Sequence, residues 1–447
     1  MGLPELIEIV PLDQPVRAEI TVPGSKSITN RALVLAALGE GETTLQGALW
    51  SEDTQVMVEC LQELGFMVNV VTDPQEPCNR TVTVYGKGGE VPPGGTEAEP
   101  LELFVGNAGT AARFLAAMVC LGKGVYRLHG VSRMHERPQA PLFQVLRELG
   151  YRLESPNDKL PALIHGAGPR TAKCRVSIDE SSQFASALLL GASAGKWQVT
   201  LSGENAEESP YVVMTSKLIS AFPRCGGRFQ VEPDASSASY FWAAGFLLSF
   251  WEALRAVRSH QDPFPAGVLA PASEVVVKAG PTSDWQVDGA FPRFLPLTAV
   301  ISRQTDLGDS IMTAVVLAPF LVKPVRFTDL GRLRVQECER VAALRTELTK
   351  CGAKVVEEGD TLTVFPSELH GAEIETFNDH RMAMCFAILG LKVPGIRLQN
   401  PACVKKTFPN FFQKLATPPP HGLGAEIWEI KDGQRTRKLS GEDLFAD

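Results

Sequence analysis

The sequence has no excess of basic residues and no residue spacing typical of a metal site. Its 447 residues carry 43 Lys and Arg against 51 Asp and Glu, which gives a formal net charge of −8. Binding to nucleic acid through its phosphates requires a basic face, so this acidic balance argues against a nucleic-acid partner. The seven histidines form no H-x-x-x-H or H-E-x-x-H pattern, and we therefore expect no bound metal.

Cysteine pairs and long apolar runs are also missing. The nine cysteines are scattered singly, without a C-x-x-C pair, which favours a reducing compartment over a disulfide framework. No apolar run approaches the roughly 18 residues of a membrane-spanning helix. The opening residues lack the basic region that precedes the apolar part of a signal peptide. We therefore expect a cytoplasmic protein that does not bind membranes.

What the chain does contain is a unit that repeats. In 27–47 a polar start is followed by an Ala/Leu-rich helical run, a Gly turn and a short alternating strand. The same outline recurs at 107–130, 182–203 and 379–400, more loosely at 309–329, and without the final strand after Asp234. Six such units predict two lobes of three rather than three separate domains.

Each unit combines two kinds of helix. The first is Ala-rich and apolar nearly all round, which is typical of a helix buried among sheets. The second, as in the stretches that begin at Thr54 and Glu339, has apolar residues at i, i+3, i+4 and i+7 before the period changes to two. We expect α/β lobes in which sheets and outer helices enclose the Ala-rich helices, with the polar helix starts at one end.

These polar helix starts form the candidate site. Small, hydroxyl and amide residues at a helix N-terminus leave backbone N–H groups free, and the helix dipole favours an anion there. Cations lie in or beside the starts, although the chain is acidic overall: Lys26, Arg31, Arg113, Arg133, Arg137, Arg381 and Lys406. Capping explains any single Ser, Asn or Asp, but cations at a helix N-terminus oppose the dipole and need another reason. The pattern predicts a pocket for polyanions.

Other catalytic motifs fit poorly. G-S-K-S resembles the end of a P-loop, but Glu19 stands five residues before Gly24, where that motif requires Gly. Cys120 lies in the apolar run A-A-M-V-C-L and is interpreted as a core residue rather than a nucleophile. No covalent cysteine chemistry is expected.

Eight sequence blocks, in order from Pro23 to Pro409, resemble those of one enzyme family. They are P-G-S-K-S-I-T-N-R-A-L, G-N-A-G-T-A-x-R, R-M-x-E-R-P, S-S-Q-F, D-A-S-S-A-S-Y-F, R-V-x-E-x-x-R, N-D-H-R-M-A-M and K-T-F-P. The chain is similar to the enolpyruvylshikimate-phosphate synthases, the 3-phosphoshikimate 1-carboxyvinyltransferases of aromatic amino-acid biosynthesis. Because the blocks span nearly the whole chain, the resemblance is specific.

The resemblance implies an α/β (α+β) fold, a two-lobed inside-out α/β barrel whose lobes each contain three βαβαββ repeats. It places one lobe at 22–233 and the other at 1–21 plus 234–447, with a cleft that closes on substrate. In the implied reaction the 5-hydroxyl of shikimate 3-phosphate attacks C2 of phosphoenolpyruvate, and phosphate leaves from a tetrahedral intermediate. Both partners are small molecules; no cofactor is implied, and a monomer is expected.

The resemblance also assigns roles to individual residues. Asp309 is implied as the base, and Glu337 and Lys26 as candidates for the acid that protonates C3. The implied ligands of phosphoenolpyruvate are Lys26, Asn107, Gly109, Arg133, Gln183, Arg340, Arg381 and Lys406. The implied ligands of shikimate 3-phosphate are Ser27, Arg31, Thr110, Ser181, Ser182, Gln183, Ser209, Arg332 and Gln336. Taken alone, Asp309 could be only a helix cap, and Glu337 and Arg340 only a surface ion pair.

The chain departs from the family pattern at the phosphate of shikimate 3-phosphate. Gln336 stands where R-V-K-E would supply a Lys, and Arg332, four residues earlier, could return the lost charge. Glu208 stands where a Ser would bind phosphate, so binding requires either that Glu208 turns away or that the neighbouring Ser209 substitutes for it. Gly109 leaves room in the phosphoenolpyruvate site for glyphosate, the family's inhibitor, which suggests sensitivity. Phe114 stands where many relatives have Pro, so the sequence does not decide whether glyphosate inhibits this protein.

Two segments do not follow the repeat. The stretch 249–290 is expected to be irregular, and the polar residues after Pro418 are expected to form a loosely held tail.

Two rival functions remain at this point. A UDP-amino-sugar enolpyruvyl transferase would share the architecture, but that family typically carries a reactive Cys on a mobile loop. A non-catalytic phosphosugar-binding protein would account for Gln336 and Glu208. Release of phosphate from phosphoenolpyruvate separates the enzymes from the binding protein.

Overall fold

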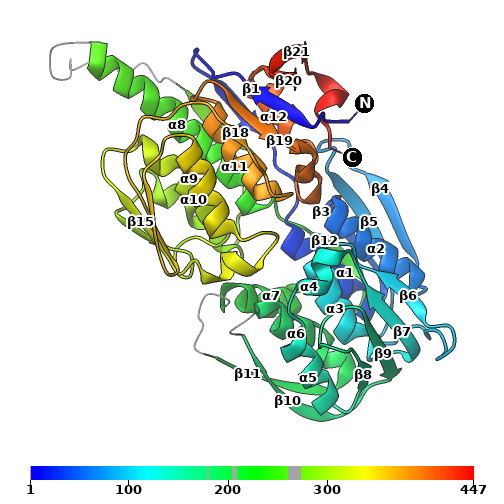
Figure 1. Ribbon diagram of the computed structural model, residues 1–447. Coiled ribbons are helices and arrows are strands. Elements are labelled where there is room, and N and C mark those ends of the chain that lie inside the picture. The colour runs from blue at the N-terminus through cyan, green and yellow to red at the C-terminus, as the bar shows by residue number, and fades with distance from the viewer. Residues whose placement is uncertain (1, 179–180, 204–208, 260–272, 447) are drawn as a thin grey trace. The chain divides into compact units, whose positions relative to one another are not determined.

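The computed structural model describes residues 2–178, 181–203, 209–259 and 273–446, with only the backbone described at 209 and 250–259. The chain divides into two compact units (Figure 1). The first, which we call the 23–233 unit, consists of Pro23–Pro233 with Ser283–Gln286. The second, the 234–447 unit, consists of Met1–Val22, Asp234–Thr282 and Val287–Asp447.

The 23–233 unit alternates helices with short strands. Its helices are α1 (Lys26–Leu38), α2 (Glu52–Glu63), α3 (Gly109–Val119), α4 (Ser132–Glu136), α5 (Ala140–Glu148), α6 (Ser182–Gly195) and α7 (Ser209–Ala221). Its strands are β3 (Glu40–Leu49), β4 (Val68–Thr72), β5 (Asn79–Lys87), β6 (Leu101–Phe104), β7 (Lys123–His129), β8 (Arg152–Glu154), β9 (Ala162–Ala167), β10 (Ala172–Ser177), β11 (Trp197–Ser202) and β12 (Gly227–Gln230). The Ala-rich helices α1, α3 and α6 pack against one another in its core, and every residue of α3 is buried.

The 234–447 unit has the same alternation. Its helices are α8 (Ala235–Ser259), α9 (Ile311–Leu317), α10 (Arg340–Lys350), α11 (His380–Gly390) and α12 (Phe411–Ala416). Its 3-10 helices are η2 (Val287–Phe294), η3 (Ala318–Phe320), η4 (Gly331–Val335), η5 (Pro401–Lys406) and η6 (Gly441–Leu444). Its strands are β1 (Leu6–Ile9), β2 (Arg17–Ile20), β13 (Glu274–Val277), β14 (Val300–Ser302), β15 (Val325–Thr328), β16 (Val355–Glu358), β17 (Thr361–Val364), β18 (Glu373–Ile374), β19 (Ile396–Gln399), β20 (Ile427–Lys431) and β21 (Gln434–Lys438).

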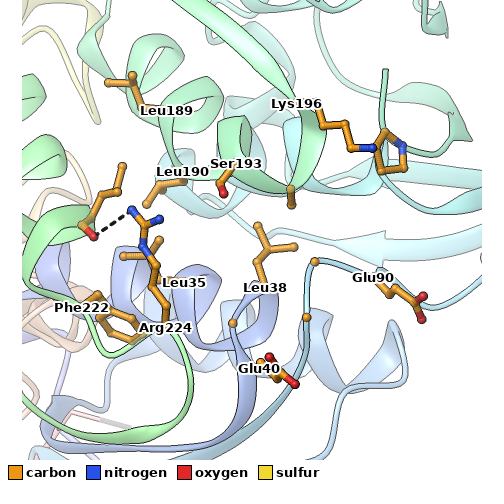
Figure 2. Close-up of a pocket in the computed structure, with 16 residues that line it drawn as sticks. Leu35, Leu38, Glu40, Glu90, Leu189, Leu190, Ser193, Lys196, Phe222 and Arg224 are labelled. Carbon is orange, nitrogen blue, oxygen red and sulfur yellow. Dashed lines mark hydrogen bonds between the residues drawn. The ribbon is translucent and has the colours of Figure 1, made fainter. Parts of the chain in front are cut away.

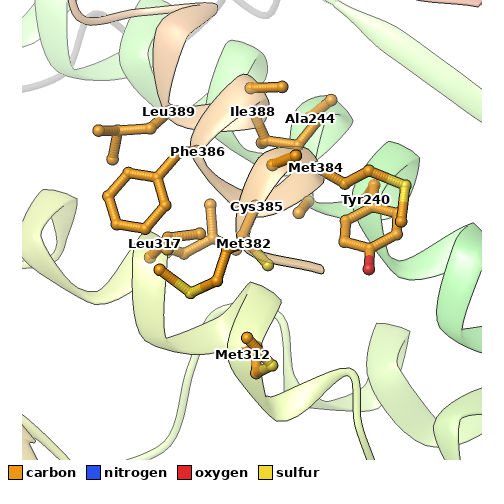
Figure 3. Close-up of a cluster of buried hydrophobic side chains, with 14 of the residues drawn as sticks. Tyr240, Ala244, Met312, Leu317, Met382, Met384, Cys385, Phe386, Ile388 and Leu389 are labelled. Carbon is orange, nitrogen blue, oxygen red and sulfur yellow. The ribbon is translucent and has the colours of Figure 1, made fainter. Parts of the chain in front are cut away.

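Helices α8, α9 and α11 form the inner layer of the 234–447 unit. All residues of α11 are buried, and this helix packs against both α8 and α9. Figure 3 shows the contact, in which Tyr240 of α8, Met312 of α9 and Met382 of α11 lie in one apolar cluster. A helix that is buried on all sides explains why the sequence pattern here is apolar nearly all round.

Three sheets repeat one topology. In the orders β12-β3-β5-β4, β6-β7-β9-β8 and β14-β15-β17-β16, the first two strands are parallel and the next two pairings are antiparallel. The third of these sheets lies in the 234–447 unit, so both units use the same supersecondary structure. The predicted α/β fold, built from a repeated unit around buried Ala-rich helices, is confirmed.

The expectation of irregular structure at 249–290 was wrong for most of the described part. Helix α8 continues to Ser259, and β13 pairs in parallel with β2, with Glu274 opposite Arg17. Strand β13 could not be predicted from the sequence, because its partner β2 lies more than 250 residues earlier in the chain and such pairing leaves no local signal.

The expectation of a loose tail after Pro418 was also wrong. Strands β20 and β21 extend the sheet of β18, β19 and β1, and Ile427 and Leu444 are buried. The charged residues of β21 misled the interpretation, because Arg435 pairs with Glu8 of β1 and Arg437 with Glu429 of the adjacent β20 in the same sheet. Strand β21 is polar because it lies at the exposed edge of the sheet, and charged side chains commonly protect such edges from pairing with other chains.

No described helix is both long and apolar enough to span a bilayer.

Candidate active site

In the 23–233 unit, Lys26 opens helix α1 and pairs with a carboxylate. Its Nζ lies 3.1 Å from Oδ2 of Asp53, a buried residue in the first turn of α2. Ser27 follows at the next position of α1. The sequence did not single out Asp53, because an acidic residue in the first turn of an amphipathic helix is ordinary.

Arg31 lies deeper, inside the helix layer. Its guanidinium donates to Thr215 Oγ1 at 2.7 Å, to Ser186 Oγ at 3.1 Å and to the Ser27 carbonyl at 2.8 Å. The side chain therefore links α1 to α6 and α7. Its assignment as a substrate ligand stays a prediction; in this structure its described bonds serve the core.

The start of α3 brings two guanidinium groups against Gly109. A Cβ atom on Gly109 would lie 2.6 Å from Arg113 Nη1 and 2.7 Å from Arg137 Nη2. Arg137 is buried, and its Nη1 donates to the Asn107 carbonyl at 3.1 Å. A side chain at this position would push these guanidinium groups aside, so the glycine of the G-N-A-G-T block has a steric reason.

The start of α6 is joined to the start of α3. Gln183 Oε1 accepts from Arg113 Nη1 at 2.7 Å, and Gln183 Nε2 donates to Thr110 Oγ1 at 3.3 Å. Ser181 caps α6 by accepting from the Gln183 backbone N–H at 3.2 Å, and the adjacent Ser182 is buried. The structure thus brings these four side chains together with Arg113, which the resemblance had not assigned a role.

The remaining predicted positions of this unit are Arg133, Glu208 and Ser209. Arg133 on α4 is half-buried and pairs with Glu136 at 2.6 Å. The side chain of Ser209 and all of Glu208 lie outside the described residues. The expectation that Glu208 turns away or that Ser209 substitutes for it therefore stays a prediction.

In the 234–447 unit, Asp309 lies among three guanidinium groups. Its Oδ1 is 3.1 Å from Arg303 Nη2, and its Oδ2 is 3.1 Å from Arg381 Nη2 and 4.0 Å from Arg340 Nη1. Burial alone would raise the pKa of Asp309, but the three guanidinium groups hold this pKa well below its usual value. A role for the carboxylate as a helix cap alone does not account for these ion pairs.

Arg340 forms the centre of the second group of charges. This residue is 1% exposed, and its guanidinium lies 2.8 Å from Glu337 and 2.7 Å from Asp379. Burial lowers the pKa of Arg340, but the neighbouring carboxylates raise it above the ordinary value. The alternative of a surface ion pair between Arg340 and Glu337 was therefore wrong, because Arg340 is buried.

Lys406 and Gln336 complete this group. Lys406 Nζ lies 3.5 Å from Glu337 Oε1, so Glu337 is between two cations. Gln336 Oε1 accepts from Arg340 Nη1. Arg332 lies on η4, four residues before Gln336, and its assignment to the phosphate stays a prediction.

The sequence reasoning missed three charged residues of this unit. Asp379 caps α11 through the Arg381 backbone N–H and also accepts from Arg340, a double role that the N-D-H-R block could have indicated. Arg303 and Asp288 gave no signal, because both lie where the repeat pattern is weak. Among the described residues no group of His, Cys, Asp and Glu could hold a metal ion.

A pocket of about 460 Å³ lies elsewhere in the 23–233 unit, at the C-terminal ends of α1, α6 and α7. Figure 2 shows its apolar side chains, including Leu35, Leu38 and Leu190, with Arg224 and Glu40 also lining it. No predicted site residue lines this pocket. Because helix C-termini carry partial negative charge, this end of the helices does not suit a polyanion.

Comparison with known proteins identifies the family and agrees with the fold. Residues 11–224 and 223–415 match the family model of EPSP synthase (3-phosphoshikimate 1-carboxyvinyltransferase). The chain is 36% identical over 435 residues to 3-phosphoshikimate 1-carboxyvinyltransferase of Trichormus variabilis, covering 92% of this chain and 98% of that one. It is 37% identical over 455 residues to the enzyme of the same name from Opitutus terrae, covering 93% of this chain and 98% of the relative.

Solved structures show the same fold at lower identity. EPSP synthase from Acinetobacter baumannii has a TM-score of 0.70 at 21% identity, over 95% of this chain and 100% of that chain. The enolpyruvyl transferase NikO from Streptomyces tendae has a TM-score of 0.63 at 17% identity, over 96% of this chain and 99% of that chain. The family match, the relatives and the shared fold lead to one conclusion: the chain belongs to the 3-phosphoshikimate 1-carboxyvinyltransferase (EPSP synthase) family.

Proposed function

We propose that this enzyme transfers the enolpyruvyl group of phosphoenolpyruvate to the 5-hydroxyl of shikimate 3-phosphate and releases phosphate. The observation that carries the proposal is the Asp309 carboxylate, 15% exposed, which lies among the guanidinium groups of Arg303, Arg340 and Arg381. Fixed cations suit two anionic substrates, and a carboxylate among them suits removal of a proton from an attacking hydroxyl.

The charge on the substrates would activate Asp309. The neighbouring guanidinium groups lower the pKa of this carboxyl against the opposing effect of burial, which makes it a weak base. Phosphate and carboxylate groups that bind Arg340 and Arg381 would offset their positive charge. The pKa of Asp309 would then rise toward a value at which it takes the proton of the 5-hydroxyl.

A second group must protonate C3 of phosphoenolpyruvate and later remove a proton. Glu337 is our first candidate, because it contacts both Arg340 and Lys406, two proposed ligands of phosphoenolpyruvate. Lys26 is the alternative, and its ammonium pairs with Asp53. Loss of phosphate from the tetrahedral intermediate then completes the transfer.

The proposed ligands form one set for each substrate. For phosphoenolpyruvate they are Lys26, Asn107, Gly109, Arg133, Gln183, Arg340, Arg381 and Lys406. For shikimate 3-phosphate they are Ser27, Arg31, Thr110, Ser181, Ser182, Gln183, Ser209, Arg332 and Gln336. Gln183 belongs to both sets, and its hydrogen bonds to Arg113 and Thr110 support such a position.

The test is phosphate release measured with phosphoenolpyruvate and either of two acceptors. We expect release with shikimate 3-phosphate and none with UDP-N-acetylglucosamine. Release only with the sugar nucleotide would favour the other class of enolpyruvyl transferase. Binding of either ligand without release would favour the phosphosugar-binding protein.

We further propose that the enzyme acts as a monomer in the cytoplasm. None of the nine cysteines, all of which lie in the described part of the chain, forms a disulfide, as expected in a reducing compartment. Sedimentation of the purified chain would test the oligomeric state.

A further inference from the structure

The position of Asp309 depends on a short stretch of backbone. Asp309 lies between Gly308 and Ser310, and Ser310 is the N-cap of α9, whose residues are all buried. On one side the carboxylate reaches Arg303, which is six residues earlier, and on the other it reaches Arg381 of α11. A shift of the 308–310 backbone would therefore move the carboxylate away from at least one guanidinium.

Asp288 on η2 holds this stretch from both sides of Asp309. Its Oδ1 accepts the backbone N–H of Ser310 at 2.7 Å. A Cβ atom on Gly308 would lie 3.0 Å from Asp288 Oδ2 and 2.8 Å from Val287 Cγ1, so the bare Gly308 backbone packs against the same carboxylate. Asp288 itself is buried, with 6% of its surface exposed.

This arrangement is electrostatically costly. Burial raises the pKa of Asp288, the negative charge of Asp309 raises it further, and the Ser310 hydrogen bond and Arg381 oppose that rise. Two carboxylates in one buried region destabilise each other unless other groups compensate. The contacts of Asp288 with the backbone on both sides of Asp309 therefore indicate a role in placing that residue, for which an acceptor oxygen at Ser310 is the essential feature.

We infer that Asp288 is a positioning residue, which fixes the backbone at Gly308 and Ser310 and thereby holds the Asp309 carboxylate between Arg303 and Arg381. The inference rests on the proposed role of Asp309 as the base. Asp288 acts through Asp309 and takes no proton from substrate.

The test compares Asp288→Ala with Asp288→Asn by steady-state kinetics and thermal unfolding. Asp288→Ala removes the acceptor for Ser310, and we expect kcat to fall about 10- to 100-fold, the effect of a displacement of about 1 Å at a reacting group. KM for both substrates should stay within about twofold, because the base does not act in binding. Asp288→Asn keeps an acceptor oxygen, and we expect it to retain most of kcat.

Glu347→Ala provides a matched control. Glu347 is also a buried carboxylate of the same unit, and its Oε2 accepts the Glu375 backbone N–H at 3.2 Å. Its removal should lower the unfolding temperature and leave kcat of the folded enzyme unchanged. Gly308→Ala is the second variant, because its new methyl group would displace the loop without removing Asp288, and we expect it to lower kcat as Asp288→Ala does.

The outcomes separate this inference from the proposed function. If Asp309→Ala is inactive while Asp288→Ala and Gly308→Ala both keep normal kcat, the positioning role is refuted and the base survives. The same refutation follows if Asp288→Ala loses only stability, as Glu347→Ala does. If Asp309→Ala itself keeps normal kcat, the proposed base fails, and the positioning role fails with it.

Discussion

The two units hold the cations at their helix starts in different ways. In the 23–233 unit, Arg113 donates to the Gln183 amide oxygen and Arg137 to a backbone carbonyl. In the 234–447 unit, Arg340 pairs with Glu337 and Asp379 instead. Neutral acceptors leave the positive charge of a guanidinium available to an anion, whereas carboxylates supply groups that can exchange protons. Lys26, which pairs with Asp53, is the exception in the first unit. In the proposed reaction the first unit would then contribute mainly anion binding, with Lys26 as its candidate for proton transfer, and the second would contribute Asp309 and Glu337.

The largest expected effect is the loss of the base. Asp309→Ala should lower kcat by about 10²- to 10⁴-fold, the usual contribution of general base catalysis. Steady-state kinetics with phosphate detection would measure it. Thermal unfolding serves as the control, and near-normal kcat in a folded variant would remove Asp309 from the mechanism.

The second prediction contrasts one buried arginine from each unit. Arg340→Met removes the guanidinium that pairs with the buried carboxylate of Asp379, while Glu337 keeps Lys406, and should cost about 3–5 kcal/mol of unfolding free energy. Arg137→Met removes a hydrogen bond to a carbonyl and should cost about 1.5–3 kcal/mol. Urea unfolding at neutral pH would measure both. Equal losses would show that the two units do not differ in how they hold cations.

The third prediction concerns pH. Although burial opposes the shift, Arg381, Arg303 and Arg340 lower the folded-state pKa of Asp309, so its ion pairs stabilise the fold above the unfolded value of about 3.9. This stabilisation is lost as the pH falls from about 3.9, the pKa of an Asp in the unfolded chain, toward the lower pKa of Asp309 in the folded protein. Asp309→Asn should therefore be less stable than the natural chain at pH 7, and the gap should narrow below about pH 4. A gap that is constant from pH 7 to pH 3 would contradict the lowered pKa.

The smallest expected effect is steric. Gly109→Ala would place a methyl group against Arg113 and Arg137, and the ends of these flexible side chains would have to move. We expect KM for phosphoenolpyruvate to rise about tenfold, equivalent to about 1.4 kcal/mol, with little change in unfolding temperature. Gly168→Ala is a control for the substitution itself, because no atom would lie within 4 Å of the new methyl group. The φ of +76 at Gly168 favours glycine, so this variant can lose stability, but its KM for phosphoenolpyruvate should not change. An unchanged KM would show that Gly109 does not border the site.

The sequence could predict those parts of the fold and site that repeat. The polar start, the Ala-rich helix and the following strand recur, so the buried helices and the candidate residues at their N-termini, such as Lys26 and Gln183, were found without a structure. Strand β13 could not be found this way, because its partner β2 lies far away in sequence.

The charged partners were harder to predict. Arg303 and Asp288 belong to loops and a 3-10 helix whose sequences follow no period, and their roles arise only from contact with Asp309 and Ser310. The burial of Arg340 was missed for a related reason. Its helix looks amphipathic and polar at its start, and only the packing of α11 beside α10 shows that the start is covered.

The most direct test of the central claim is to follow the carbon that is transferred. Phosphoenolpyruvate labelled with ¹³C at C2, mixed with shikimate 3-phosphate and the enzyme, should yield a ¹³C signal of an enol ether attached to the shikimate ring. The Asp309→Ala variant should yield almost none. Phosphate release that produces labelled pyruvate instead of the ether would contradict enolpyruvyl transfer.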